Sequence, residues 1–247
     1  MKGVLFMNGY PALLVVKERA LVVGDLHIGI ESKLEEEGVS IENAADRMAE
    51  RLLQLYDKAK AKSIILLGDV KDSISFPTGD EYESIRRFFM RIGGIEIRIA
   101  RGNHDAHMER IAKSAGLSFT LENEVLLADA ALLHGNAWPS EAAMSKDYLI
   151  TAHSHFAIEH DGYLQKAWLV AKVSDAAASK YTKFNKLAKL VVMPAFNDLI
   201  LGSRISERTK DYSPLLKHGI FDWKSAKIYT IDGVLVGSAE SASRAAK

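Results

Sequence analysis

The chain of 247 residues contains no cysteine, which excludes disulfide bonds and thiolate metal ligands. Any metal ion that it binds is therefore held by oxygen and nitrogen atoms. Positive and negative charges balance, with 32 Lys and Arg residues against 32 Asp and Glu residues. This balance argues against a protein that coats nucleic acid through bulk charge, although a local basic groove is compatible with it.

Long apolar segments are absent as well. No apolar run approaches the roughly 20 residues that a membrane span requires. Asn8 and Gly9 interrupt the N-terminal segment before a signal-peptide core forms. We therefore predict a cytoplasmic protein with no membrane partner. No repeat, linker or shift in composition marks a second domain, so we expect one domain over residues 1–247 with a disordered tail at 238–247.

What the sequence does contain is an alternation of strand and helix patterns, followed by a part rich in strands. Apolar runs predict strands at 20–23, 63–67, 95–100, 125–127, 130–133, 148–152, 166–173, 190–192 and 199–201. Asp232-Gly233 predicts a hairpin of 227–231 with 234–236. Helical spacing predicts helices over 41–59, with Ser40 as N-cap, over 80–92 and over 108–114. This order predicts an α/β fold in which two sheets pack together with helices outside.

Five short fragments follow strand-like runs and end in residues that bind metal ions. The fragments are Asp25-Leu26-His27, Gly68-Asp69-Val70-Lys71-Asp72, Gly102-Asn103-His104-Asp105, His134-Gly135 and His153-Ser154-His155. An α/β sheet places its active site at the ends of its strands, so we expect the fragments to converge. Residues i and i+2 of a strand share a face. This spacing predicts that Asp25 and His27 chelate one ion from extended backbone and that His153 and His155 project together.

The combination of carboxylate, imidazole and amide oxygen indicates a two-metal phosphoesterase. Two cations about 3.5–4 Å apart clamp phosphoryl oxygens and lower the pKa of a bridging water, which helps an anionic nucleophile reach an anionic phosphorus. Two carboxylates, one amide and four imidazoles suit borderline ions better than magnesium or calcium. We predict two divalent ions, manganese first, with iron, zinc, cobalt and nickel as alternatives.

His104 is predicted to be a catalytic residue. It stands directly after Asn103 and before Asp105 in the third fragment. An imidazole that is oriented by a carboxylate can donate a proton to a leaving alkoxide. We therefore predict that His104 assists the leaving oxygen and that Asp105 orients it.

At these residues the chain resembles the calcineurin-like metallophosphoesterase superfamily, whose signature order is D-x-H, G-D-x-x-D, G-N-H-D/E, H and G-H-x-H. All five blocks occur in this order between Gly24 and His155. The chain looks most similar to the archaeal SbcD-related and bacterial DNA-ligase-associated phosphoesterases. Supporting features are the strand pair before Gly24 and the segment Met193-Pro194-Ala195-Phe196-Asn197. The resemblance implies a four-layer α/β/β/α sandwich.

The resemblance also implies a role for each matching residue. It gives the first ion Asp25, His27 and His155, the second ion Asn103, His134 and His153, with Asp69 as the bridge and His104 as the catalytic histidine. Asp72 matches the second Asp of its block, and we interpret it as a residue that orients a ligand. Ala152 departs from the pattern, since glycine usually precedes His-x-His. A methyl group is tolerated there if the backbone stays in the β region, but it is expected to shift His153 and change the metal preference.

The substrate signals lie outside the five blocks and are weaker. Residues 172–189 carry five lysines with Tyr181 and Phe184 interleaved, a combination that can bind a phosphate backbone and stack bases. The alternative, which we favour slightly, is a solvated loop between strands. Arg101, Lys180 and Lys183 are the predicted substrate contacts. The sequence Trp138-Pro139 is expected to be a packed loop rather than a base-stacking platform.

The main hypothesis is a dinuclear-metal-dependent phosphodiesterase that acts on DNA, another nucleic acid or nucleotides, such as a DNA-repair nuclease. A phosphomonoesterase or protein phosphatase is the alternative. SbcD-type nucleases carry an additional DNA-capping domain, for which 247 residues leave little room, and this argues against processive exonuclease action. A non-catalytic scaffold is less favoured, since neither a ligand nor the catalytic histidine is missing. The sequence leaves the native metal pair and the oligomeric state open, a dimer included.

Overall fold

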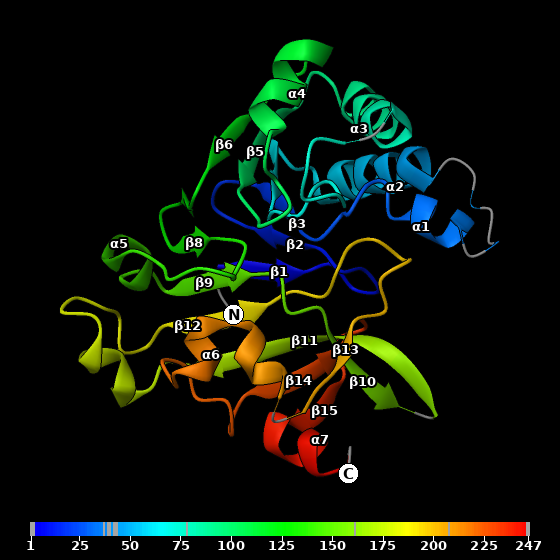
Figure 1. The fold of residues 1–247 in the computed structure, drawn as a ribbon. Coiled ribbons are helices and arrows are strands. Elements are labelled where there is room, and N and C mark those ends of the chain that lie inside the picture. Colours follow the sequence, from blue (N-terminus) through cyan, green and yellow to red (C-terminus); the bar gives the residue numbers. More distant parts are fainter. Residues whose placement is uncertain are drawn as a thin grey trace.

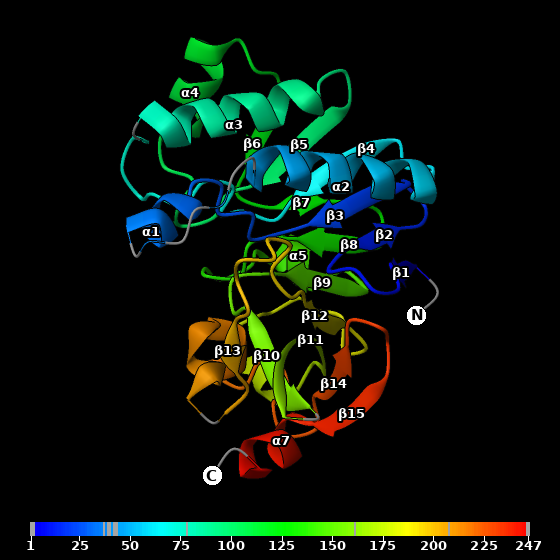
Figure 2. The same cartoon turned by 90° about the vertical axis from the view of Figure 1, so that its right-hand side faces the viewer.

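The computed structural model describes residues 3–36, 38, 41, 44–77, 79–160, 162–206 and 208–245. In this part of the chain, two β-sheets pack face to face and helices cover their outer faces (Figures 1 and 2). The predicted α/β fold of two packed sheets flanked by helices is therefore confirmed. No helix of the described part is long and apolar enough to span a membrane.

The first sheet contains six strands in the described residues, and they follow the order of the chain. They are β1 (Val4–Phe6), β2 (Leu13–Val15), β3 (Ala20–Val23), β4 (Ser63–Leu66), β5 (Glu96–Ala100) and β6 (Thr120–Glu122). The strands β3 to β6 are parallel, and Val23 lies opposite Leu66, which in turn lies opposite Ile99. Because β3, β4 and β5 end level with one another, the three loops that follow them begin at the same edge of the sheet.

The second sheet contains nine strands in the described residues, in the order β13-β10-β11-β12-β9-β8-β7, with β14 beside β11 and β15 beside β14. They are β7 (Val125–Leu126), β8 (Ala130–Leu132), β9 (Tyr148–Thr151), β10 (Phe156–His160), β11 (Tyr163–Lys172), β12 (Lys189–Val192), β13 (Ser203–Arg204), β14 (Lys227–Thr230) and β15 (Leu235–Ser238). The strands β8 and β9 are parallel, with Leu132 opposite Ile150. The loops that follow β8 and β9 carry His134 and His153. These two fragments therefore also lie at one edge of the second sheet.

Three apolar layers hold the sandwich together. Between the sheets, Trp168 is almost completely buried and its ring centroid lies 4.5 Å from that of Phe6. A second layer joins the first sheet to α2 and α3, and a third joins the second sheet to the chain that covers its outer face. The helical segments are α1 (Glu31–Glu36), α2 (Ala44–Ala59), α3 (Gly79–Arg91), α4 (Met108–Ala115), α5 (Glu141–Met144), α6 (Pro214–Lys217), α7 (Ala239–Ala245) and the 3-10 helices η1 (Asp175–Ser179) and η2 (Thr209–Tyr212).

The long helix α2 illustrates how the sequence produces this arrangement. Its buried residues, including Met48, Leu52 and Leu55, recur at helical spacing and face the first sheet. The predicted N-cap Ser40 lies outside the described residues, and the described helix begins at Ala44.

Two predicted segments differ in the structure. Residues 199–201 form a turn rather than a strand, because the N–H of Leu199 donates to the Asn197 side chain and the N–H of Ile200 to its carbonyl oxygen. The predicted disordered tail is also wrong for residues 238–245. Ser238 ends β15, and Ser238 and Ser241 exchange side-chain to backbone hydrogen bonds at the start of α7. These bonds satisfy free N–H groups at the helix start, while Ala239 is fully buried.

Candidate metal centre

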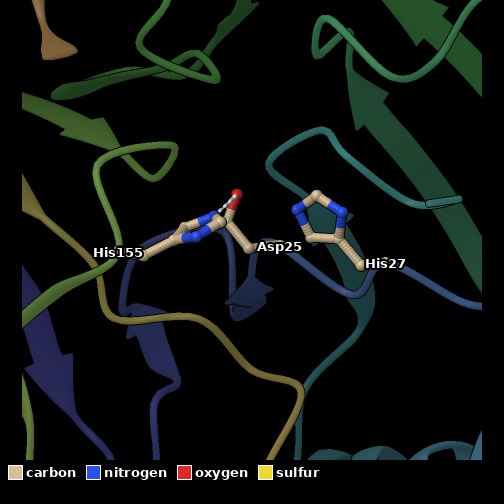
Figure 3. A group of neighbouring side chains, drawn as sticks. All are labelled: Asp25, His27 and His155. Atoms are coloured by element: carbon tan, nitrogen blue, oxygen red, sulfur yellow. Dashed lines mark ion pairs between the residues drawn. The ribbon is translucent and has the colours of Figure 1, made fainter. Parts of the chain in front are cut away.

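The five fragments meet where the loops after β3, β4 and β5 face the loops after β8 and β9. One group of candidate metal ligands consists of Asp25, His27 and His155, whose ligand atoms all lie within 4.8 Å of one another. Figure 3 shows Asp25 and His155 in contact, with the His27 ring beside them. The Oδ1 atom of Asp25 lies 3.2 Å from Nε2 of His155. The backbone N–H of His153, which is 128 positions away in the sequence, also donates to the Asp25 carboxylate.

A second group consists of Asp69, His134 and His153. Nε2 of His134 lies 3.1 Å from Oδ2 of Asp69 and 3.0 Å from Nδ1 of His153. Oδ1 of Asn103 lies 3.2 Å from the same His134 nitrogen, so the amide oxygen belongs to this group. Asn103 is exposed, whereas His134 is buried, so the group opens to solvent on the Asn103 side.

Asp69 stands between the two groups. Its Oδ2 atom lies 3.6 Å from Nε2 of His27 and 3.1 Å from Nε2 of His134. Its other oxygen accepts the backbone N–H of His104 at 2.9 Å. Because Oδ1 is engaged in this way, Oδ2 is the atom presented to both groups. The grouping of these seven residues is the one that the resemblance implies.

The imidazoles are held so that specific nitrogens face the centre. Nδ1 of His134 donates to the carbonyl oxygen of Leu67 at 2.7 Å, which leaves Nε2 without a proton in the neutral ring. Nδ1 of His27 lies 3.2 Å from Oδ1 of Asp72, which also contacts the Lys33 ammonium through its other oxygen. Asp72 therefore orients the His27 ring, in the arrangement expected of a carboxylate behind a metal-binding histidine.

The unpaired atoms and charges of this centre fit divalent cations. Nε2 of His27 is buried and has no hydrogen-bond partner in the described structure, while the buried Nε2 of His155 faces only Oδ1 of Asp25, at 3.2 Å. Burial opposes ionisation of Asp25 and Asp69, but the neighbouring histidines hold both carboxyl pKa values below their ordinary range. Burial lowers the pKa of His134, yet its bond to Asp69 and the charge of Asp25 raise that pKa to about 9. Two buried carboxylate anions beside unpaired imidazole nitrogens form a donor set that oxygen- and nitrogen-binding ions complete.

The backbone at the centre is strained at the candidate ligands themselves. Asp25, His27, Asp69, His153 and His155 have φ angles of 56°, 40°, 48°, 65° and 42°. The left-handed region is costly for residues with a side chain, and such strain concentrates at functional sites. The extended strand ends predicted for Asp25-x-His27 and His153-x-His155 are therefore wrong. As a consequence, His153 and His155 point into different groups instead of projecting together.

Asp105 holds the loops together rather than orienting His104. Its carboxylate is fully buried and accepts the backbone N–H groups of Asp69, Val70 and Gly102 at 2.9, 2.8 and 2.7 Å. The loop after β4 and the loop after β5 are thereby fixed to one another. The predicted contact of Asp105 with the His104 ring is wrong, because all three of these bonds bind backbone.

The His104 ring is oriented by a different residue, Asp72. Nδ1 of His104 donates to the backbone carbonyl oxygen of Asp72. A carbonyl oxygen can only accept, so the proton is on Nδ1 and Nε2 faces away from this bond. The ring is half-buried and its centroid lies 4.8 Å from that of His27. The catalytic histidine proposed from the sequence therefore borders the first ligand group and has access to solvent.

Comparison with known proteins agrees with this geometry. The family model described as calcineurin-like phosphoesterase matches residues 18–185, which include every candidate ligand. The chain belongs to the calcineurin-like phosphoesterase family. Members of this family are hydrolases of phosphate esters, and the candidate clusters of histidine and aspartate in this chain are consistent with divalent metal binding. No curated protein sequence matches the chain.

Solved structures of this phosphoesterase fold resemble the chain at low sequence identity. The structure of the nuclease MPE from Pseudomonas putida is 16% identical, with a TM-score of 0.59, over 90% of this chain and 89% of that chain. The structure of Yfce, a phosphoesterase from E. coli, is 14% identical, with a TM-score of 0.40, over 88% of this chain and 96% of that chain. The first likeness supports the fold assignment.

The three residues predicted to contact the substrate of the phosphoesterase differ in their positions relative to the candidate metal centre. Arg101 lines a groove beside His134, although its guanidinium is paired with Glu109. Lys180 reaches the same neighbourhood, since its Nζ lies 4.0 Å from the ring centroid of Trp138. Lys183 is exposed and does not line this groove. The structure therefore brings Arg101 to the groove beside His134 and Lys180 to the ring of Trp138, which lines the same groove.

Supporting residues that the sequence patterns did not single out brace the first ligand loop of the phosphoesterase. The side-chain amide of Asn197 donates to the carbonyl oxygen of Leu26 at 2.7 Å. The nearly buried Lys166 ammonium donates to the carbonyl oxygens of Ala195 and Asn197 at 2.8 and 2.6 Å. Burial lowers the pKa of Lys166 to about 8, although Asp198 opposes the shift. The only sequence signal was the segment 193–197, which supported the family resemblance without indicating this role.

Lys71 supports the loop that follows β4 in the phosphoesterase. Its side chain is completely buried, and Nζ donates to the carbonyl oxygens of Ser73 and Ser75, the latter at 2.9 Å. These bonds fold residues 72–75 around the ammonium group, next to the Asp72 carbonyl that orients His104. No sequence pattern indicated a buried lysine within a ligand fragment.

Ala152, the one departure from the superfamily pattern, packs against Gly24. Ala152 is buried and is not among the residues with positive φ, so its methyl group is tolerated in the way expected. A Cβ atom on Gly24 would lie 2.7 Å from the Ala152 Cβ and 3.1 Å from that of Leu67. The glycine before Asp25 therefore leaves the space that the alanine before His153 fills.

We expect Gly24→Ala to lower the free energy of unfolding by about 1–3 kcal/mol, because it overpacks this contact. Ala152→Gly alone is expected to cost about 0.5–1 kcal/mol through backbone entropy. In the double variant the nearest clashing atom is gone, so the loss should be smaller than the sum by about 1 kcal/mol. Urea denaturation of the four proteins in a double-mutant cycle measures this coupling. Strictly additive losses would show that the two positions do not share space.

Proposed function

We propose that this chain is a metal-dependent phosphodiesterase that cleaves phosphodiester bonds in nucleic acid or nucleotides. The observation that carries the proposal is the position of Asp69, whose Oδ2 atom faces Nε2 of His27 and Nε2 of His134. A carboxylate oxygen that faces both ligand groups would serve two divalent ions held side by side, which would supply the charge neutralisation of a two-metal phosphoesterase. The ligands would be Asp25, His27 and His155 for the first ion and Asn103, His134 and His153 for the second, with Asp69 shared.

When bound, two divalent ions supply charge neutralisation at the phosphoryl oxygens and an acidified water. The mixture of imidazole and carboxylate ligands supports manganese as the first choice, with iron, zinc, cobalt and nickel as alternatives. The chain itself contributes the orientation of the ligands. Asp72, Asp105 and the carbonyl oxygen of Leu67 hold the rings and loops in place.

His104 is proposed to act on the leaving group. Water adds its oxygen to phosphorus, the bond from phosphorus to the ester oxygen breaks, and the departing alkoxide needs a proton. Because Nδ1 of His104 is committed to the Asp72 carbonyl oxygen, Nε2 is the atom that can deliver that proton when the ring is protonated. The products are a phosphomonoester and an alcohol.

The surroundings of the centre favour a diester substrate over a small monoester. Asn103 is exposed, and the groove that His134 and Arg101 line has a volume of about 730 Å³. A wide groove admits the second ester chain, and the nearby cations Arg101 and Lys180 suit a phosphate backbone. The Pseudomonas putida nuclease has the same fold, which is compatible with this choice of substrate.

Metal reconstitution tests the proposed function directly. Protein stripped of metal with a chelator is expected to hydrolyse no phosphate ester, and added Mn²⁺ should restore hydrolysis of a model diester such as bis(p-nitrophenyl) phosphate. The same preparation is compared on p-nitrophenyl phosphate and on single- and double-stranded DNA. Monoester hydrolysis without diester hydrolysis would contradict the proposal and support the phosphomonoesterase alternative.

A further inference from the structure

A groove leads away from the candidate metal centre toward an exposed tryptophan. Its lining includes Gly102 and His134 from the centre, and Asn136, Trp138 and Pro139 from the loop that follows His134. Its volume is about 730 Å³. A single groove therefore connects the phosphate-binding position to the Trp138 indole ring.

Trp138 remains partly exposed although the loop that carries it is packed, as expected from its sequence. Its side chain is 38% exposed, whereas Trp168 and Trp223 are 1% and 6% exposed. Nζ of Lys180 lies 4.0 Å from its ring centroid, and the His218 ring lies against it at 5.2 Å. A large aromatic surface beside a cation, next to a site for phosphate, has the composition of a nucleotide-binding platform.

The loop that carries Trp138 is fixed to the body of the protein. The buried hydroxyl of Tyr181 donates to the carbonyl oxygen of Pro139 at 3.1 Å. At the next residue, the N–H and hydroxyl of Ser140 both donate to the Glu124 carboxylate, whose charge faces these donors. A ring on an anchored loop loses little freedom when a flat ligand binds to it.

The neighbouring aromatic residues cannot take this role. Tyr181 is 5% exposed and uses its hydroxyl to hold Pro139, and Phe184 packs on the apolar layer outside the second sheet. The basic stretch 172–189 thus places Lys180 against the Trp138 ring, while its aromatic residues serve packing. Of these aromatic residues, Trp138 is the one whose ring is exposed enough to stack against a base.

We infer that Trp138 stacks against an unpaired base of a single-stranded nucleic acid whose phosphate is held at the metal centre. The base takes the place of the exposed Lys180 side chain over the indole ring, and the ammonium group moves to a backbone phosphate. A base inside a duplex has both faces covered, so the platform selects single strands or frayed ends. This inference rests on the proposed function, because it names the substrate of the same site.

Binding of two labelled oligonucleotides tests the inference. One is an oligodeoxythymidylate of about 12 nucleotides, and the other is an abasic strand of the same length that keeps every phosphate. Fluorescence anisotropy is measured with the manganese-loaded full chain in a His104→Ala background, which slows cleavage. Trp138→Ala is expected to weaken binding of the thymidylate about tenfold while leaving the abasic strand and the salt dependence unchanged.

Two further variants make the result specific. Trp138→Phe keeps an aromatic face and should lose less affinity than Trp138→Ala. Leu187→Ala removes a residue that is 85% exposed on the same basic stretch but outside the groove, and it should bind as the parent does. Equal losses for both oligonucleotides, or no loss for either, would overturn the inference. If the parent chain hydrolyses no diester yet shows this dependence on Trp138, the platform stands and the proposed function fails.

Discussion

Replacement of Asp69 by Asn is expected to remove most of the bound metal and to reduce phosphodiester hydrolysis roughly a thousandfold or more, since clamping of the phosphoryl group by two ions is worth several kcal/mol. The substitution keeps the shape of the side chain. Oδ1 of Asp69 accepts the N–H of His104 at 2.9 Å, so the oxygen of an asparagine would be drawn to this position. Its NH₂ group would then replace Oδ2 and direct hydrogens at the space between His27 and His134.

Metal content after manganese loading and desalting, measured by mass spectrometry, checks this expectation alongside the hydrolysis rate. Asp72→Asn is the matched control, because it alters a carboxylate that touches His27 and not the space between the groups. Loss of such an orienting partner is expected to lower metal affinity or activity only about 10–100-fold. A full complement of manganese in Asp69→Asn would rule out Asp69 as the shared ligand.

The convergence of the fragments could be predicted because it depends on strand order and direction. Apolar runs located β3, β4 and β5, and polar residues after consecutive parallel strands have to share an edge. Side-chain chemistry then indicated a metal centre, and the structure groups Asp25, His27 and His155 apart from Asp69, His134 and His153. The strand positions and the metal-binding residue types are both visible in short segments of the sequence, and the same pattern recurs after each strand.

The backbone conformation of the ligand loops could not be predicted in the same way. Alternation of apolar residues reports which face is buried, and it carries no information once the strand has ended. The residues with positive φ include Asp25 and His153, and they meet across the sheets through the Asp25 carboxylate, which accepts the N–H of His153. An expectation of extended backbone was therefore wrong even though the predicted ligand side chains lie close together.

The roles of Asp105 and Lys71 show the same limit for supporting residues. A carboxylate directly after His104 suggested a contact between the two side chains, but the buried Asp105 instead binds N–H groups from two loops. Lys71 is charged and would be expected at the surface, yet three carbonyl oxygens enclose it. Backbone groups left free by irregular loops set these requirements, and they become visible only when the loops are placed together.

His104→Ala is expected to reduce kcat for phosphodiester hydrolysis about 100- to 10,000-fold, the contribution usual for a positioned proton donor, while leaving the manganese content unchanged. The His104 ring contacts the Asp72 carbonyl and the His27 ring. It forms a third cluster with His27 and Asp72, apart from the two groups of candidate ligands that Asp69 joins. Mass spectrometry of the metal and steady-state kinetics measure the two effects separately. His107→Ala is the matched control, because this exposed histidine lies in the same segment but outside the ligand groups.

The leaving group distinguishes proton donation by His104 from a general disturbance of the site. A nitrophenolate leaves without much help, whereas the alkoxide of a nucleoside needs a proton as the bond to phosphorus breaks. His104→Ala should therefore lose far more activity on a dinucleotide than on a nitrophenyl diester of the same charge. Equal losses on the two substrates would show that the ring positions the phosphate instead, and unchanged activity on both would remove His104 from the mechanism. Nδ1 of His104 is bonded to the Asp72 carbonyl oxygen. Nε2 is therefore the atom that either donates the proton or contacts the phosphate.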